Sequence, residues 1–99
     1  MVEITSSEKF SNIINEENVL VDFYADWCGP CQMMSELLKD EEENYPNIRF
    51  TRLNTDRFQL LAQKYNVSSI PTLIVFSNGK IIKQKTGFLR REELNEFLK

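Results

Sequence analysis

The chain has 99 residues, of which 41% are hydrophobic and 27% charged, a balance typical of one globular domain with a single core. The net charge of −3 and the sequence pI of about 5.0 argue against nucleic acid or an anionic membrane as the main partner, because both attract basic surfaces. The longest apolar runs are too short to span a bilayer, and the opening segment MVEITSSEKF does not resemble a secretory signal. We therefore expect a single domain over residues 1–99, a monomer located in the cytoplasm, with no nucleic-acid and no membrane partner.

The first half of the sequence predicts a strand, a helix, a second strand and a second helix. Residues 2–4 favour a short strand, and Thr5 with Glu8 has the spacing of a capping box at the start of the first helix. Residues 19–25, VLVDFYA, are mostly apolar on both faces and rich in strand-forming residues, which is typical of a central strand covered on both sides. An apolar stripe over residues 33–38 then predicts the second helix.

Two details of the second helix follow from its sequence. Met33 and Met34 are expected to face the core. Four acidic residues at 40–43 come at the predicted C-terminal end, where the helix dipole disfavours negative charge. We therefore expect this end of the helix to be solvated and frayed.

The second half of the sequence predicts three more strands and two more helices. The strands are expected over 48–53, 72–76 and 81–86, and the helices over 58–65 and around 94–98. Asn78-Gly79 is a strong hairpin signal between the last two strands. Alternating strands and helices predict parallel strands with helices on both faces, to which the hairpin adds an antiparallel edge. We therefore expect an α/β fold, a three-layer α/β/α sandwich with a mixed central β-sheet.

Cys28 and Cys31 are the only cysteines, and only Gly29 and Pro30 separate them. The pair can be a structural disulfide, part of a metal site, or a redox-active dithiol. A disulfide across so short a loop removes little entropy from the unfolded chain. A structural zinc site needs four Cys or His ligands, and this chain has two cysteines and no histidine. No metal site is therefore expected, unless a second chain completes one.

The predicted position of the pair favours the redox function. Cys28 follows a predicted strand and precedes a predicted helix, where unpaired N–H groups and the helix dipole favour a thiolate. Pro30 suits the first helical turn, and Gly29 leaves space for a partner to approach. Cys31 should lie inside that turn, within reach of Cys28. We expect Cys28 to attack a substrate disulfide and Cys31 to resolve the mixed disulfide.

The segment WCGPC after an apolar strand resembles the active site of the thioredoxin family. The resemblance extends over VDFYADWCGPC, RLNTD and IPTLIVFSNGK, and to Gly87 before the last helix. It implies the thioredoxin fold and a protein-disulfide reductase with no bound cofactor. It also implies that a thioredoxin reductase drawing on NADPH supplies the electrons, and that the clients are disulfide-containing proteins.

The same resemblance suggests roles for residues around the cysteines. Asp22 matches an aspartate that helps to deprotonate the resolving cysteine, and its burial in a strand should raise its pKa. The alternative is that Asp22 bonds a backbone group or pairs with a cation. Arg52 stands where many relatives have a lysine near this aspartate, so it either holds Asp22 ionised or is a simple surface arginine. Glu36 replaces a proline that kinks the active-site helix, so that helix can run straighter.

Ile70-Pro71 matches the family's cis-proline segment, which lies against the active-site sulfurs and pairs with the substrate backbone. Trp27, Ile70, Pro71 and Gly87 are therefore expected to form a shallow apolar docking surface. Trp27 can otherwise belong to the core. Two other functions remain open, an oxidase or isomerase of the same fold and a redox-silent adaptor. The Gly-Pro spacer argues against the first, and the intact cysteine pair argues against the second.

Overall fold

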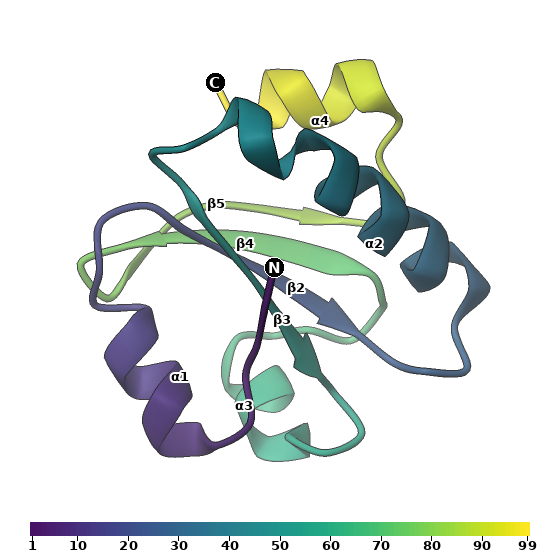
Figure 1. Ribbon diagram of the computed structural model, residues 1–99. Coiled ribbons are helices and arrows are strands. Elements are labelled where there is room, and N and C mark those ends of the chain that lie inside the picture. The colour runs from purple at the N-terminus through teal and green to yellow at the C-terminus, as the bar shows by residue number, and fades with distance from the viewer.

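The computed structural model describes residues 1–99 and places a five-stranded sheet between two pairs of helices (Figure 1). The order of strands and helices is the one predicted from the sequence. In chain order the elements are β1 (Val2–Glu3), α1 (Ser7–Ile13), β2 (Val19–Tyr24), α2 (Gly29–Glu41), the one-turn helix η1 (Glu42–Asn44), β3 (Arg49–Asn54), α3 (Gln59–Lys64), β4 (Thr72–Ser77), β5 (Lys80–Thr86) and α4 (Arg91–Phe97). None of these helices has the length and apolar character needed to cross a membrane.

The sheet has the strand order β1-β3-β2-β4-β5. Strands β1, β3 and β2 are parallel, whereas β4 runs antiparallel to both β2 and β5. The turn between β4 and β5 has φ of 53° at Asn78 and 84° at Gly79. Positive φ at both central residues is the geometry of the tight hairpin turn that Asn-Gly favours. The predicted mixed sheet and its hairpin are both confirmed.

The helices form the two outer layers of the predicted three-layer sandwich. Helices α1 and α3 cover one face of the sheet, and α2 and α4 cover the other (Figure 1). Successive side chains of β2 alternate between the two faces, so Phe23 packs with the α1 side and Leu20 with the α2 side. Asp22 points to the same side as Leu20 and therefore faces the layer formed by α2 and α4.

Two local predictions were wrong. Ser6, and not Thr5, caps α1, because its hydroxyl oxygen accepts a hydrogen bond of 3.0 Å from the backbone N–H of Lys9. Glu8 therefore does not occupy the capping-box position. Of the two adjacent methionines, Met34 is fully buried, but 59% of Met33 is exposed. Neighbouring helical residues point about 100° apart, so only one of the two reaches the core.

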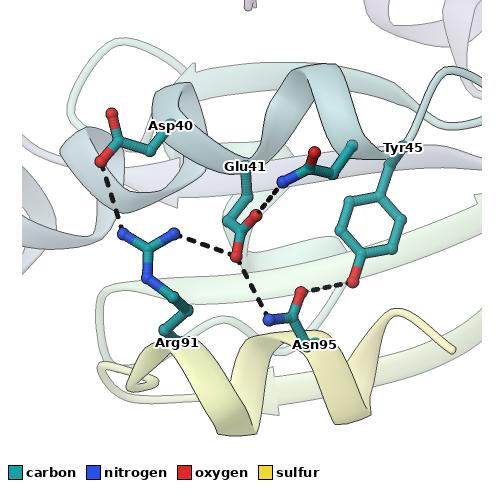
Figure 2. A network of polar contacts seen from close by, with 6 residues as sticks. Asp40, Glu41, Tyr45, Arg91 and Asn95 are labelled. Carbon is teal, nitrogen blue, oxygen red and sulfur yellow. Dashed lines mark hydrogen bonds and ion pairs between the residues drawn. The ribbon is translucent and has the colours of Figure 1, made fainter.

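The expectation of a frayed end to α2 was also wrong, and the expectation of a solvated acidic run holds for Asp40 and Glu43 but not for Glu41 (Figure 2). Glu41 is only 3% exposed and pairs with Arg91 at 3.0 Å. It accepts hydrogen bonds from Asn44 at 2.6 Å and from Asn95 at 3.2 Å. The bond from Asn44, together with those from Asn95 and Arg91, outweighs burial and lowers the pKa of Glu41. The end of α2 is thus fixed to α4 by polar partners that lie far away in the sequence.

Candidate active site

The two cysteines are joined by a disulfide at the start of α2. Cys28 is the N-cap residue, with extended backbone angles (φ −93°, ψ 108°), and the Cα atoms of Cys28 and Cys31 are 5.2 Å apart. The backbone N–H of Cys31 donates a hydrogen bond of 3.2 Å to Sγ of Cys28. Pro30 occupies the first turn, where its missing N–H has no helical acceptor in any case. The dipole of a 13-residue helix therefore points its positive end at the Cys28 sulfur, as predicted.

A surface groove of about 440 Å³ opens beside this disulfide. Its lining residues are Trp27, Cys28, Gly29, Pro30, Ser68, Ser69 and Ile70. Cys31 does not line the groove and is 1% exposed. A molecule in the groove therefore meets Cys28 first. The two serines were not expected from the sequence, although their position directly before Ile70-Pro71 is a signal that could have found them.

Trp27 lies on the surface and not in the core. Its side chain is 73% exposed, and its indole Nε1 donates a hydrogen bond of 2.8 Å to Oδ2 of Asp56. Asp56 follows the end of β3, and the carboxyl ends of parallel strands β2 and β3 meet at the same edge of the sheet. That topology brings Asp56 to Trp27. The hydrogen bond holds an exposed indole ring in one orientation beside the groove.

The segment around Pro71 closes the other side of the site. The Ile70–Pro71 peptide bond is cis, as the family resemblance implied. Ile70 is half-buried and packs against the cluster that contains both cysteines. Pro71 itself is buried, and its carbonyl accepts a hydrogen bond of 2.7 Å from the N–H of Gly87. Pro71 and Gly87 are thus joined to each other, and neither lines the groove.

Asp22 is completely buried. Neither of its carboxylate oxygens has a hydrogen-bond partner in the protein. Burial, partly offset by the positive charge of Arg52 and reinforced by the negative charge of Glu3, raises the pKa of Asp22 to about 7. The alternative prediction, a backbone hydrogen bond or an ion pair for Asp22, is not what the structure contains. A carboxyl group with this pKa can exchange a proton near neutral pH.

Arg52 is the neighbour of Asp22 across the β2–β3 pair, but its guanidinium group interacts elsewhere. Its Nε lies 3.6 Å from Oε1 of Glu3, and its Cζ lies 3.8 Å from the centre of the Tyr24 ring. Arg52 is therefore neither an ion-pair partner of Asp22 nor a simple surface arginine. Its charge lowers the pKa of Asp22, but burial has the larger effect.

Glu36 is exposed on α2, outside the groove, and the helix continues without interruption from Gly29 to Glu41. No group of three or more Cys, Asp or Glu side chains is placed to hold a metal ion. Cysteine sulfur is the only atom type in the groove that undergoes reversible disulfide chemistry. The fold and the site therefore define a thiol–disulfide oxidoreductase.

Comparison with known proteins narrows this class to one family. The sequence pattern of the thioredoxin family matches residues 1–99 of this chain. The chain therefore belongs to this family. It is 40% identical to a thioredoxin of Chlamydia pneumoniae over 98 residues, covering 99% of this chain and 96% of the relative. It is 43% identical to thioredoxin-1 of Saccharomyces cerevisiae over 83 residues, covering 84% of this chain and 81% of the relative.

The fold comparison agrees with this assignment. A solved structure of Plasmodium falciparum thioredoxin superposes with a TM-score of 0.93 at 29% sequence identity, covering 99% of this chain and 96% of that one. Family membership together with the adjacent cysteine pair identifies the activity as reduction of protein disulfides.

Proposed function

We propose that Cys28 is the nucleophile and Cys31 the resolving thiol of this reductase. The observation that carries the assignment is that Cys28, 5% exposed, lines the groove, whereas Cys31, 1% exposed, does not. In the first step the Cys28 thiolate attacks one sulfur of a client disulfide, forms a mixed disulfide and releases the other client sulfur as a thiolate. In the second step the Cys31 thiolate attacks Cys28 Sγ, releases the second client thiolate and leaves the Cys28–Cys31 disulfide.

Asp22 takes the proton of the Cys31 thiol in the second step of this proposal. A buried thiol needs a base to become a nucleophile, because the thiolate and not the thiol attacks. Asp22 has a pKa of about 7, so it is partly unprotonated at neutral pH and can accept that proton. Its position on the α2 side of the sheet supports this role.

The client docks across Trp27 and Ile70, and Pro71, which Gly87 holds by a hydrogen bond, supports Ile70 from outside the groove. Trp27 and Ile70 line the groove together with Cys28 and supply apolar surface there. Gly29 and Pro30 present no bulky or charged group beside the sulfur, and a Cβ added at Gly29 would meet no atom within 4 Å. An extended client segment can therefore bring its disulfide to Cys28.

In the proposed cycle a thioredoxin reductase returns the Cys28–Cys31 disulfide to the dithiol with electrons from NADPH. The protein acts as a monomer and as a single domain over residues 1–99, in the cytoplasm, where reduced thiols are maintained. The positive charge of Arg52 lowers the pKa of Asp22, and Glu36 makes the outer face of α2 more acidic. Neither residue takes part in bond exchange.

The assignment of the two sulfurs can be tested by trapping the mixed disulfide. In Cys31→Ser the first step still occurs and the second cannot. Incubation with disulfide-bonded insulin should therefore accumulate a covalent adduct between Cys28 and an insulin cysteine. Cys28→Ser should form none. Non-reducing gels and intact mass spectrometry measure both. Adduct formation by Cys28→Ser but not by Cys31→Ser would reverse the proposed roles.

A further inference from the structure

Three charged residues form one row across the sheet, at the level of the buried aspartate. Glu3 of β1 is the register partner of Arg52 of β3, and Arg52 is the register partner of Asp22 of β2. Residues paired in this way project from the same face of the sheet. The order of charge along the row is therefore negative, positive, negative, with only the Asp22 end fully buried.

The guanidinium group of Arg52, in the middle of this row, lies toward Glu3 and not toward Asp22. Oε1 of Glu3 lies 3.6 Å from Arg52 Nε, an ion pair without a hydrogen bond, and Oε2 accepts a hydrogen bond of 2.7 Å from the Tyr24 hydroxyl. The guanidinium group lies over the Tyr24 ring, with Cζ 3.8 Å from its centre. Asp22, although it is a direct register partner of Arg52 just as Glu3 is, is left with neither a hydrogen bond nor an ion pair.

We propose that Glu3 is a positioning residue for the disulfide exchange: its carboxylate, anchored by Tyr24, holds the Arg52 guanidinium away from the buried Asp22. An arginine free to pair with Asp22 would fix that carboxyl group in its ionised form, because guanidinium binds carboxylate through paired hydrogen bonds. The base would then be too weak to take a proton from Cys31. The inference rests on the proton role proposed above for Asp22.

The surroundings of Asp22 leave few other charges to set its protonation. The groups that face its side of the sheet from the packed elements are Arg52 of β3, Glu3 of β1, Leu73 of β4, and Cys31, Met34 and Leu38 of α2. Apart from the Cys31 thiol in the reduced protein, the only ionisable members are Arg52 and Glu3. Burial raises the pKa of Tyr24 to about 12, and its hydrogen bond to Glu3 adds to this rise, so Tyr24 stays a neutral donor.

Glu3→Gln removes one negative charge and releases Arg52, and both changes should lower the pKa of Asp22. Glu3 stands two strand spacings from Asp22, roughly 10 Å, so its charge alone accounts for a fall of about 0.3 to 1 pH unit. The release of Arg52 should add to this fall. Carboxyl ¹³C NMR titration of the oxidised protein measures the pKa of Asp22 directly. Glu8→Gln, which removes an exposed glutamate from α1, is the charge-matched control and should leave it unchanged.

A double-mutant cycle distinguishes an effect of Glu3 on the position of Arg52 from a direct effect of the Glu3 charge on Asp22. If Glu3 acts through Arg52, Glu3→Gln should shift the Asp22 pKa more in the wild-type background than in Arg52→Gln. Equal shifts in the two backgrounds, or no shift at all, would overturn the proposal. The pH profile of insulin reduction should move in the same direction as the titration. If Asp22→Asn leaves that profile unchanged, the proton role of Asp22 fails, while the titration still decides the role of Glu3.

Discussion

Replacing Asp22 by asparagine should make the oxidised protein more stable, and increasingly so as the pH rises. The pKa of Asp22 is raised from its ordinary value of 3.8 to about 7 by burial, so below that pH the folded protein holds a proton that the unfolded chain has lost. Between these two values the folded state binds more protons than the unfolded state. Wild-type stability therefore falls as the pH rises through this window and levels off above it.

The size of the effect follows from the two pKa values. A difference of about three pH units, at about 1.4 kcal/mol each, corresponds to about 4 kcal/mol of stability. Asparagine has nearly the same shape and never ionises. The gain in stability of Asp22→Asn over the wild type should therefore grow by about 4 kcal/mol between about pH 4 and about pH 8.

Urea denaturation of both oxidised proteins across this pH range measures the difference. Asp40→Asn is the matched control, because the Asp40 side chain is 71% exposed and burial does not penalise its charge. Its stability difference from the wild type should change far less with pH. A difference between Asp22→Asn and the wild type that stays constant from acid to alkaline pH would refute the assignment of a raised pKa to Asp22.

Three further substitutions test other parts of the structure. Glu41→Gln should lower the melting temperature at neutral pH and make little difference in acid, since the lowered pKa of Glu41 provides stability that is lost as the pH falls. Trp27→Ala should reduce kcat/KM for insulin about tenfold and change the free energy of unfolding by less than about 0.5 kcal/mol, because an exposed indole serves contact more than folding. Gly79→Ala should lower the free energy of unfolding, measured by chemical denaturation, by at least about 1 kcal/mol. The reason is that φ of Gly79 is +84° and the added Cβ would lie 2.7 Å from Asn15 Oδ1.

The substitutions of Glu41 and Gly79 each have a control on a nearby exposed residue. Glu43→Gln, in the same acidic run, should not reproduce the pH-dependent loss of Glu41→Gln, and an equal loss would mean that the network in Figure 2 is not responsible. Lys80→Ala should leave the hairpin stable, and equal effects of Lys80→Ala and Gly79→Ala would remove the backbone explanation. Unchanged turnover by Trp27→Ala would exclude this ring from client binding.

The main features of the fold and the site could be predicted from the sequence because they depend on local signals. The alternation of strands and helices fixes parallel pairing, and Asn78-Gly79 specifies the hairpin turn. The place of Cys28 at the start of a helix follows from the strand before it and from Pro30 after it. These signals involve residues only a few positions apart.

The remaining features depend on contacts between distant segments. The burial of Glu41 requires Asn95, which lies 54 residues away and reaches it only when α4 packs beside α2. The position of Arg52 requires the strand order that places β1 beside β3, and no local pattern specifies that order. The nearness of Arg52 to Asp22 was predicted correctly, whereas the burial of Glu41 and the pairing of Arg52 with Glu3 could not be predicted.

The most direct test of the account is the reduction of insulin with dithiothreitol as electron donor, comparing the wild type with Cys28→Ser. The wild type should accelerate the precipitation of reduced insulin chains, and Cys28→Ser should not exceed the rate with dithiothreitol alone. Equal acceleration by both proteins, or none by the wild type, would contradict the claim that the Cys28–Cys31 pair carries the reaction.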